Sequence, residues 1–329
     1  MSSSQQQVQL MHFGKLPGRG DFVRSATHTG LVQIFDRWFS GALDLLAADA
    51  RWKELYDGAE PLHFAVLGPR RPHVVAGHIR PSADGSGRRF PFLVAGMLEV
   101  DDPASFMGRA PLALNRLWTQ CDQWARRAQQ EADPTSVLAA LGQHRVEVNT
   151  AAAAYDAPTA DFTDMQTVGS AQALLNHAAR EVDFARCVLG LGVLLQPVPA
   201  SGSARLDTGV RLPLPMDPLY RPYMASWWLD LVRGFLARAD FEVLLLLPQS
   251  PEAPASIAIG FAGGSAPALA AYLGRRPQEA PYVDLLNPEW ADEPAQQDPA
   301  VRKLASYLQQ QGLSLAQVGR TFREAFLGE

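Results

Sequence analysis

The sequence has few cysteines and no recognisable signal for secretion or membrane insertion. Only two of its 329 residues are cysteine, Cys121 and Cys187, which is too few for a disulfide scaffold or a cysteine zinc site. The N-terminal stretch MSSSQQQVQL lacks the basic start and apolar run of a secretory signal, and about 18 uncharged apolar residues never follow one another. These absences predict a cytoplasmic protein without a membrane span, in which both thiols are buried.

The chain also has fewer positively than negatively charged side chains. The chain has 29 lysines and arginines against 34 aspartates and glutamates, a net charge of -5. Without an overall positive field, nucleic acid and anionic membrane surfaces are improbable partners. With 47% hydrophobic and 19% charged residues, the chain can build an extensive core, and its length suffices for two domains.

Familiar catalytic and metal-binding motifs are missing as well. No two histidines are spaced four apart around a glutamate, as in a zinc-protease helix. His73 and His78 lie five residues apart on one expected strand, so they point to opposite faces and a shared metal is disfavoured. Residues 263–267 resemble a nucleophile elbow, but Pro267 replaces its second glycine. Residues 14–20 lack the ending of a phosphate-binding loop, and we expect no catalytic residue, metal or cofactor.

Apolar periodicity and turn residues predict the elements of the first part of the chain. Apolar residues spaced three and four apart predict a helix over 31–46, and Asp102 before Pro103 marks the start of a second long helix. Three strands joined by short turns, and therefore antiparallel, are expected between these helices: 62–67, 73–80 and 90–98. Trp38 and Trp118 lie centrally on the two helices, and we expect them to pack against the same sheet face.

The second part shows a similar alternation. We expect two helices, two antiparallel strands and a covering helix, in this order: 170–190, 224–235, 241–247, 257–261 and 267–273. Trp227 and Trp228 diverge by about 100° on their helix, so one should face the core and the other is a candidate partner anchor.

The expected fold class is α+β, with central, mostly antiparallel sheets flanked by amphipathic helices in two layered domains. We place the domains at residues 1–132 and 133–329.

Two charged, turn-rich segments contain the most specific pattern in the sequence. They are FGKLPGRGDF at residues 13–22 and GHIRPSADGSGRRFPF at 77–92. Glycine and proline recur every two or three residues in the first segment, which predicts a shaped loop. In the second, Asp84 is placed to cap the N–H groups of a hairpin turn and to pair with Arg88. We expect both loops to lie close together at the ends of neighbouring strands.

Together with PLHFAVLGP at residues 61–69, these segments resemble the N-terminal domain of the TagF family, also called ImpM. The resemblance covers roughly residues 11–130. TagF proteins are accessory proteins of bacterial type VI secretion, so the resemblance implies a cytoplasmic, post-translational regulator that restrains assembly of the apparatus. It also implies a partner, the forkhead-associated scaffold protein of that system.

The loops supply six candidate partner-binding residues: Lys15, Arg19, Asp21, Ser82, Asp84 and Arg88. An alternative hypothesis is a phosphate-recognising or hydrolytic enzyme that uses all of them except Ser82, with the cations and loop N–H groups binding an anion. Geometry separates the two hypotheses. Side chains that converge on an open site with shifted pKa values favour an enzyme, whereas side chains locked in local pairs favour a binding protein. The missing catalytic motifs favour the binding protein.

Overall fold

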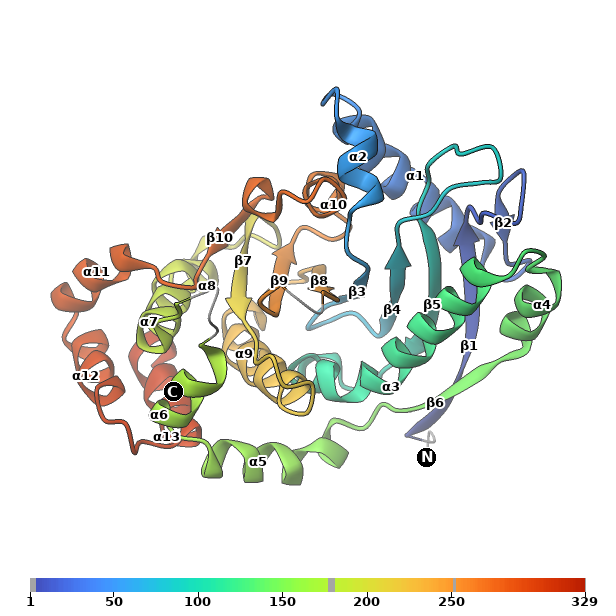
Figure 1. Ribbon diagram of the computed structural model, residues 1–329. Coiled ribbons are helices and arrows are strands. Elements are labelled where there is room, and N and C mark those ends of the chain that lie inside the picture. Colours follow the sequence, from blue (N-terminus) through green and yellow to red (C-terminus); the bar gives the residue numbers. More distant parts are fainter. Residues whose placement is uncertain (1–3, 177–180, 251–252, 329) are drawn as a thin grey trace.

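The computed structural model describes residues 4–176, 181–250 and 253–328, and its fold is α+β, built on one sheet of ten strands (Figure 1). The strands are β1 (Gln5–Gly14), β2 (Val23–Arg24), β3 (Leu62–Leu67), β4 (His73–Arg80), β5 (Phe92–Glu99), β6 (Arg145–Asn149), β7 (Leu206–Pro213), β8 (Val243–Pro248), β9 (Ser256–Phe261) and β10 (Tyr282–Asp284). Their order across the sheet is β10-β7-β9-β8-β3-β4-β5-β1-β2, and β6 pairs with β1. Antiparallel pairing predominates, and β10 pairs with β7 in parallel.

The sheet continues from the first part of the chain into the second. β3 and β8 lie side by side, with Leu62 opposite Pro248 and Leu67 opposite Val243. Strands of both parts therefore form one sheet rather than a separate sheet each. The predicted domain division at residues 132 and 133 stays a prediction.

Helices cover both faces of this sheet. They are α1 (Thr29–Leu46), α2 (Trp52–Asp57), α3 (Pro103–Gln130), α4 (Thr135–Gln143), α5 (Asp156–Met165), α6 (Val168–Leu175), α7 (Phe184–Leu195), α8 (Val198–Ser201), α9 (Arg221–Leu236), α10 (Ala266–Leu273), α11 (Asp292–Gln297), α12 (Pro299–Leu308) and α13 (Leu315–Leu327), with short 3-10 turns η1 (Ala152–Tyr155), η2 (Pro277–Glu279) and η3 (Glu289–Ala291). One core lies beneath α1 and α10, and another beneath α3 and α9. Neighbouring strand residues alternate between the two cores, as Phe64 and Ala65 do.

The two central tryptophans lie on opposite sheet faces, so the expectation of a shared face is wrong. Trp38 packs against the ring of Phe64, with the ring centroids 5.9 Å apart. Trp118 approaches β3 from the other side, where its Nε1–H donates to the carbonyl oxygen of Phe64 at 2.8 Å. The error arose because helical periodicity marks a buried face but not which side of the sheet it covers. Ile34, one of the apolar residues whose spacing predicted the helix over 31–46, is 52% exposed and does not belong to its buried face.

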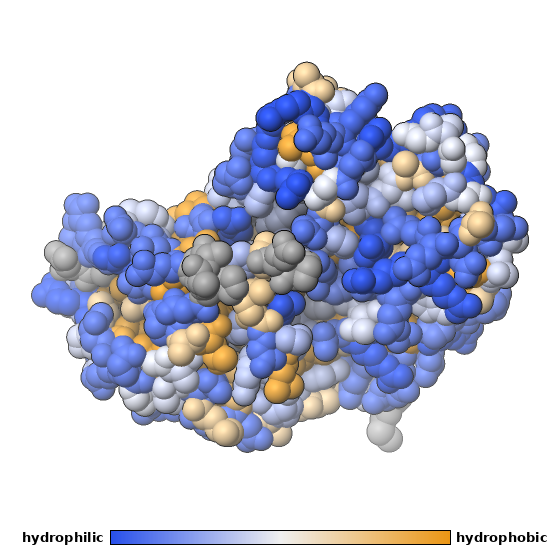
Figure 2. All heavy atoms as spheres, viewed as in Figure 1, coloured by the Kyte–Doolittle hydropathy of each residue, from blue (hydrophilic) through white to orange (hydrophobic). Residues whose placement is uncertain are grey.

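Helix α3 begins as predicted, because the side chain of Asp102 accepts a hydrogen bond from the backbone N–H of Ser105 at 3.1 Å. Its inner side is apolar, whereas Figure 2 shows a mostly hydrophilic surface over its outer side. One long helix thus covers several strands and presents charge to solvent.

Two expectations in the second part are wrong. The helix predicted over 170–190 is instead α6 and α7, since Asp183 starts a new helix by accepting from the backbone N–H of Arg186 at 3.0 Å; residues 177–180 lie outside the described residues. Trp227 and Trp228 are both buried, so neither is a partner anchor. Their indole N–H groups donate to the carbonyls of Leu315 and Pro213.

One segment among the described residues, Phe184–Ser201, is long and apolar enough to cross a membrane by composition. Half of it is buried within the protein, where it forms α7 and α8. A core helix of a soluble protein has the same composition.

Candidate functional site

The two charged loops meet at one end of the sheet, as predicted. The backbone N–H of Gly85 donates to the carbonyl of Arg19 at 2.7 Å, and the hydroxyl of Ser82 donates to the carbonyl of Lys15 at 2.7 Å. Gly14 permits this approach. Its φ is +132°, and a Cβ atom there would lie 2.0 Å from the carbonyl oxygen of Pro91.

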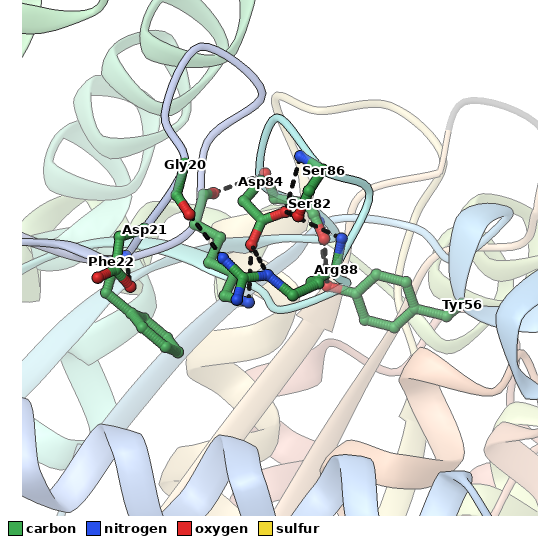
Figure 3. Close-up of polar contacts among 9 residues, drawn as sticks. Gly20, Asp21, Phe22, Tyr56, Ser82, Asp84, Ser86 and Arg88 are labelled. Carbon is green, nitrogen blue, oxygen red and sulfur yellow. Dashed lines mark hydrogen bonds and ion pairs between the residues drawn. The ribbon is translucent and has the colours of Figure 1, made fainter.

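Asp84 is the centre of the contacts between the loops (Figure 3). Its Oδ2 lies 3.0 Å from Nζ of Lys15 and 2.7 Å from Nε of Arg88. Its Oδ1 accepts from the backbone N–H groups of Ser86 and Arg88, both at 3.0 Å, and from the hydroxyl of Ser86 at 2.7 Å. The predicted turn-capping role and the Asp84–Arg88 pair are confirmed. We call Lys15, Asp84, Ser86 and Arg88 the Asp84 cluster.

The electrostatics of the cluster keep Asp84 ionised. Burial alone would raise the pKa of this carboxyl, but the hydrogen bonds from Ser86, Lys15 and Arg88 outweigh burial and hold the pKa well below its ordinary value. Lys15 is itself buried and lies over the ring of Phe22, 5.0 Å from its centroid. The charges of Lys15, Asp84 and Arg88 are therefore paired with one another, and Lys15 and Asp84 are closed off from solvent.

Ser82 fixes the second loop to the body of the protein. It is buried, its backbone N–H donates to the hydroxyl of Tyr56 at 3.0 Å, and its carbonyl accepts from that hydroxyl at 3.1 Å. Tyr56 belongs to α2, and sequence reasoning did not single it out, because nothing in its local pattern indicates a distant partner.

The outer residues of the loops form a surface that we call the loop crest: Gly20, Asp21, Phe22, Gly85, Ser86, Gly87 and Arg88. Phe22 is 41% exposed and packs edge-on against Phe90, with centroids 4.8 Å apart. The Arg88 side chain is 62% exposed, and its Nη2 donates to the carbonyl of Gly20 at 2.6 Å. Asp21 accepts from the backbone N–H of Phe22 at 2.8 Å.

The six predicted residues therefore divide into three groups. Lys15 and Arg88 contact Asp84 directly, and Ser82 joins this group because its hydroxyl donates to the backbone carbonyl of Lys15. Arg19 turns away, since its Nη2 lies 3.2 Å from the carboxylate of Asp133 and donates to the hydroxyl of Thr135. Asp21 stays on the loop crest.

Comparison with known proteins relates the first part of the chain to a protein family. Residues 12–144 match the TagF N-terminal domain, which is described as type VI secretion system-associated. The chain has a TagF N-terminal domain. Both loops lie within the TagF domain, so the resemblance predicted from them is confirmed.

Other comparisons add little to this TagF domain assignment. No curated protein matches the chain. Among solved structures, the chain is similar to PA0076 from Pseudomonas aeruginosa PAO1, with 18% sequence identity and a TM-score of 0.46 over 80% of this chain and 94% of that one. At this score and identity, the likeness carries no argument about fold or function.

The TagF domain contains a second polar cluster that sequence reasoning missed. β3 and β4 place His63 opposite His78, with their Nδ1 atoms 2.9 Å apart. His78 Nε2 lies 3.0 Å from Oδ1 of Asp122 on α3, and the ring of Trp118 stacks on His63 at 5.6 Å between centroids. We call His63, His78 and Asp122 the histidine cluster.

A signal for the histidine pair was available in the sequence. His63 and His78 are equally far from the turn at residues 70 and 71, and a symmetric hairpin pairs such positions. Burial lowers the pKa of both rings. Among the described residues, no group of three or more histidine, cysteine, aspartate or glutamate side chains is arranged to hold a metal ion.

Proposed function

We propose that the protein is a non-enzymatic accessory factor of the type VI secretion system that restrains assembly of the apparatus after translation. The TagF N-terminal domain supports the association with that system. The resemblance of the loops to TagF proteins supports the partner, the forkhead-associated scaffold protein. We assign the contact with that partner to the loop crest.

The burial and mutual pairing of Lys15 and Asp84 is the observation that carries this proposal. A catalytic acid, base or nucleophile must reach its substrate, but Lys15 and Asp84 are buried and bonded to each other. The lowered pKa of Asp84 also makes it a poor proton acceptor at neutral pH. These features weigh against the alternative enzyme hypothesis and favour a cluster that shapes the loops.

The loop crest has properties that suit a partner surface. Aromatic side chains and arginine are enriched in protein interfaces, and the crest presents Phe22 and Arg88 beside the carboxylate of Asp21. The contacts below the crest hold both loops in one shape, so binding requires little ordering of the protein.

Isothermal titration with the purified scaffold protein tests the surface directly. We expect Phe22→Ala and Asp21→Arg each to weaken binding at least about tenfold, as loss of an interface anchor does. The melting midpoint should be unchanged for Asp21→Arg and lower for Phe22→Ala, which also loses the contacts with Phe90 and Lys15. Met165→Ala is the matched control, because Met165 is an exposed apolar side chain on α5, outside the TagF match.

Two results would remove the proposal. If the wild-type protein does not bind the scaffold at high micromolar concentration, and its overproduction does not suppress secretion in cells, the regulator hypothesis should be abandoned. If binding is intact in both crest variants, the scaffold contacts another surface.

A further inference from the structure

A large polar cavity lies between the TagF domain and the helices that follow it. Its volume is about 830 Å³, and it is lined by the first residues of α3, by η1 and α5, by the middle of α9 and by the first half of α13. Ser4 also lines it, just before β1, whereas the loops with the crest follow the opposite end of that strand. Ten strand residues span about 33 Å, so this cavity is separate from the loop crest (Figure 1).

Three helices direct arginines at a single carboxylate in this cavity. Asp230 on α9 lies 2.6 Å from Nε of Arg233, 3.6 Å from Nη1 of Arg109 on α3 and 3.5 Å from Nη1 of Arg323 on α13. The first distance is a hydrogen bond, but the other two are too long for one. One carboxylate is therefore shared by three guanidinium groups and satisfies few of their donors.

A fourth arginine in the lining has no polar partner among the described residues. Arg320 on α13 is exposed, and neither its side chain nor that of Arg323 makes a hydrogen bond within the part of the chain that the structure describes. Since each guanidinium has five N–H donors in a planar fork that matches carboxylate and phosphate oxygens, the cavity offers unused donors for an anion.

Three further carboxylates line the cavity besides Asp230. Asp102 is occupied in capping α3, and Asp101 is exposed. Asp156 pairs with Arg109 at 3.2 Å, but its side chain is 61% exposed. The lining as a whole has four arginines and four aspartates. Around Asp230, however, three arginines face a single carboxylate.

We propose that this cavity binds a small molecule with two or more negative charges, a phosphate compound or a polycarboxylate. Cavities of roughly 300 to 1,000 Å³ accommodate small ligands. The anion takes hydrogen bonds from Arg320 and Arg323 and shares the remaining guanidinium groups with Asp230. Because α3 belongs to the TagF match and α5, α9 and α13 follow it, a bound anion ties the two parts of the chain together.

Titration of the full-length protein with pyrophosphate and with citrate tests the proposal and separates the two sources of charge. We expect saturable heat of binding and a saturable rise of the melting midpoint with at least one probe, because a ligand of the folded state stabilises it. Sodium chloride at matched ionic strength should reproduce neither.

Three variants locate the site. Arg320→Ala should weaken binding at least about tenfold with an unchanged melting midpoint, since it removes only unpaired donors. Asp230→Asn should bind the probe more tightly, because the competing carboxylate is gone. Arg302→Ala is the control, an exposed arginine of α12 outside the cavity lining.

The proposal fails if neither probe binds saturably up to about 10 mM, at which a dissociation constant below that value would be detected. Equal affinity of the wild type and Arg320→Ala would also overturn it. If Asp230→Asn does not fold, Arg320→Ala and Arg302→Ala still decide the question.

Discussion

Asp84 and Asp122 are two carboxylates of the TagF domain that each hold several cationic or polar partners, but they differ in what those partners are. Asp84 is fully buried and is bonded to Lys15, Arg88 and backbone N–H groups. Asp122 is 20% exposed and contacts His78 as well as Arg80 and Arg126. Lysine and arginine stay charged throughout the neutral range, whereas histidine loses or gains its proton near neutrality.

This difference predicts that acid affects the two regions in different pH ranges. The hydrogen bonds to Asp84 and to Asp122 hold both pKa values well below the ordinary aspartate value. Neither carboxylate therefore changes its charge between pH 7 and 5. The rings of His63 and His78 are held neutral in the folded protein, because burial lowers their pKa, but they gain protons in that range once they are released to water. Acid should therefore loosen the contact between α3 and the sheet before it affects the loop crest.

The largest effect that we expect on the Asp122 side comes from Trp118, which covers His63. Trp118→Ala should cost about 3 to 5 kcal/mol in the free energy of unfolding, since it empties a buried aromatic site. Urea unfolding followed by circular dichroism measures this loss. Trp38→Ala is the matched variant on the other sheet face and should cost a similar amount.

Trp118→Phe separates packing from hydrogen bonding at the same position. It keeps most of the buried ring but removes the hydrogen bond to the carbonyl of Phe64, which should cost about 1 to 3 kcal/mol because that oxygen loses a partner. An unchanged midpoint for Trp118→Ala would contradict the packing seen at the histidine cluster.

On the Asp84 side, we expect Asp84→Asn to lower the melting midpoint by roughly 5 °C or more. The isosteric amide leaves the buried ammonium of Lys15 without an opposite charge. Asp122→Asn should have a smaller effect, because Arg80 and Arg126 are partly exposed and His78 is neutral. A larger loss for Asp122→Asn would reverse the comparison between the two carboxylates.

The response to pH tests the same comparison with the wild-type protein. Burial lowers the pKa of His63 and His78, and it lowers the pKa of His12 to about 4. An unfolded chain has a histidine pKa of about 6.5. Because the folded protein favours the neutral rings, this stability is complete above pH 6.5 and is lost as the pH falls below that value.

His12 alone should contribute a loss of roughly 2 kcal/mol between pH 7 and 5, because each pH unit below about 6.5 lowers the free energy of unfolding by about 1.36 kcal/mol until the folded pKa is reached. Urea unfolding at pH 7, 6 and 5 measures the total, and the double variant His63→Gln with His78→Gln should make the profile shallower, leaving the contribution of His12. A flat profile for the wild type would mean that the histidines are not held neutral.

More of the Asp84 cluster than of the histidine cluster could be predicted from the sequence. Asp84 and Arg88 lie four residues apart in one turn, and glycine and proline around them mark that turn. The contact of His78 with Asp122 needs a strand and a helix whose relative placement depends on the packing of the whole sheet face. The cavity around Asp230 likewise needs three helices far apart in the sequence.

The strands, too, could be predicted only where their pairing partners lie close in the sequence. β3, β4 and β5 follow one another along the chain, with linkers too short for a parallel crossover. Their apolar runs and turn residues therefore predict both the strands and their antiparallel pairing. β7 and β10 were not predicted, because their partners are far away in the sequence: β10 pairs with β7 in parallel, and β7 pairs with β9 antiparallel. No local signal marks such partners.

The smallest effect should come from Arg19, the predicted site residue that turns away from the Asp84 cluster. Its partner Asp133 is 75% exposed and its own side chain 38%, and exposed ion pairs contribute about 0.2 to 1 kcal/mol. Arg19→Glu should therefore leave the melting midpoint nearly unchanged, with any difference disappearing at high salt. Arg88→Glu should lower the midpoint clearly, because it places a carboxylate against the buried carboxylate of Asp84. If both charge reversals lower the midpoint equally, the exposed Arg19–Asp133 pair supports the loops as much as the Asp84 cluster does. If neither does, the loops keep their shape through Ser82, Tyr56 and the aromatic contacts of Phe22, and weaker scaffold binding by Arg88→Glu would then report on the loop crest alone.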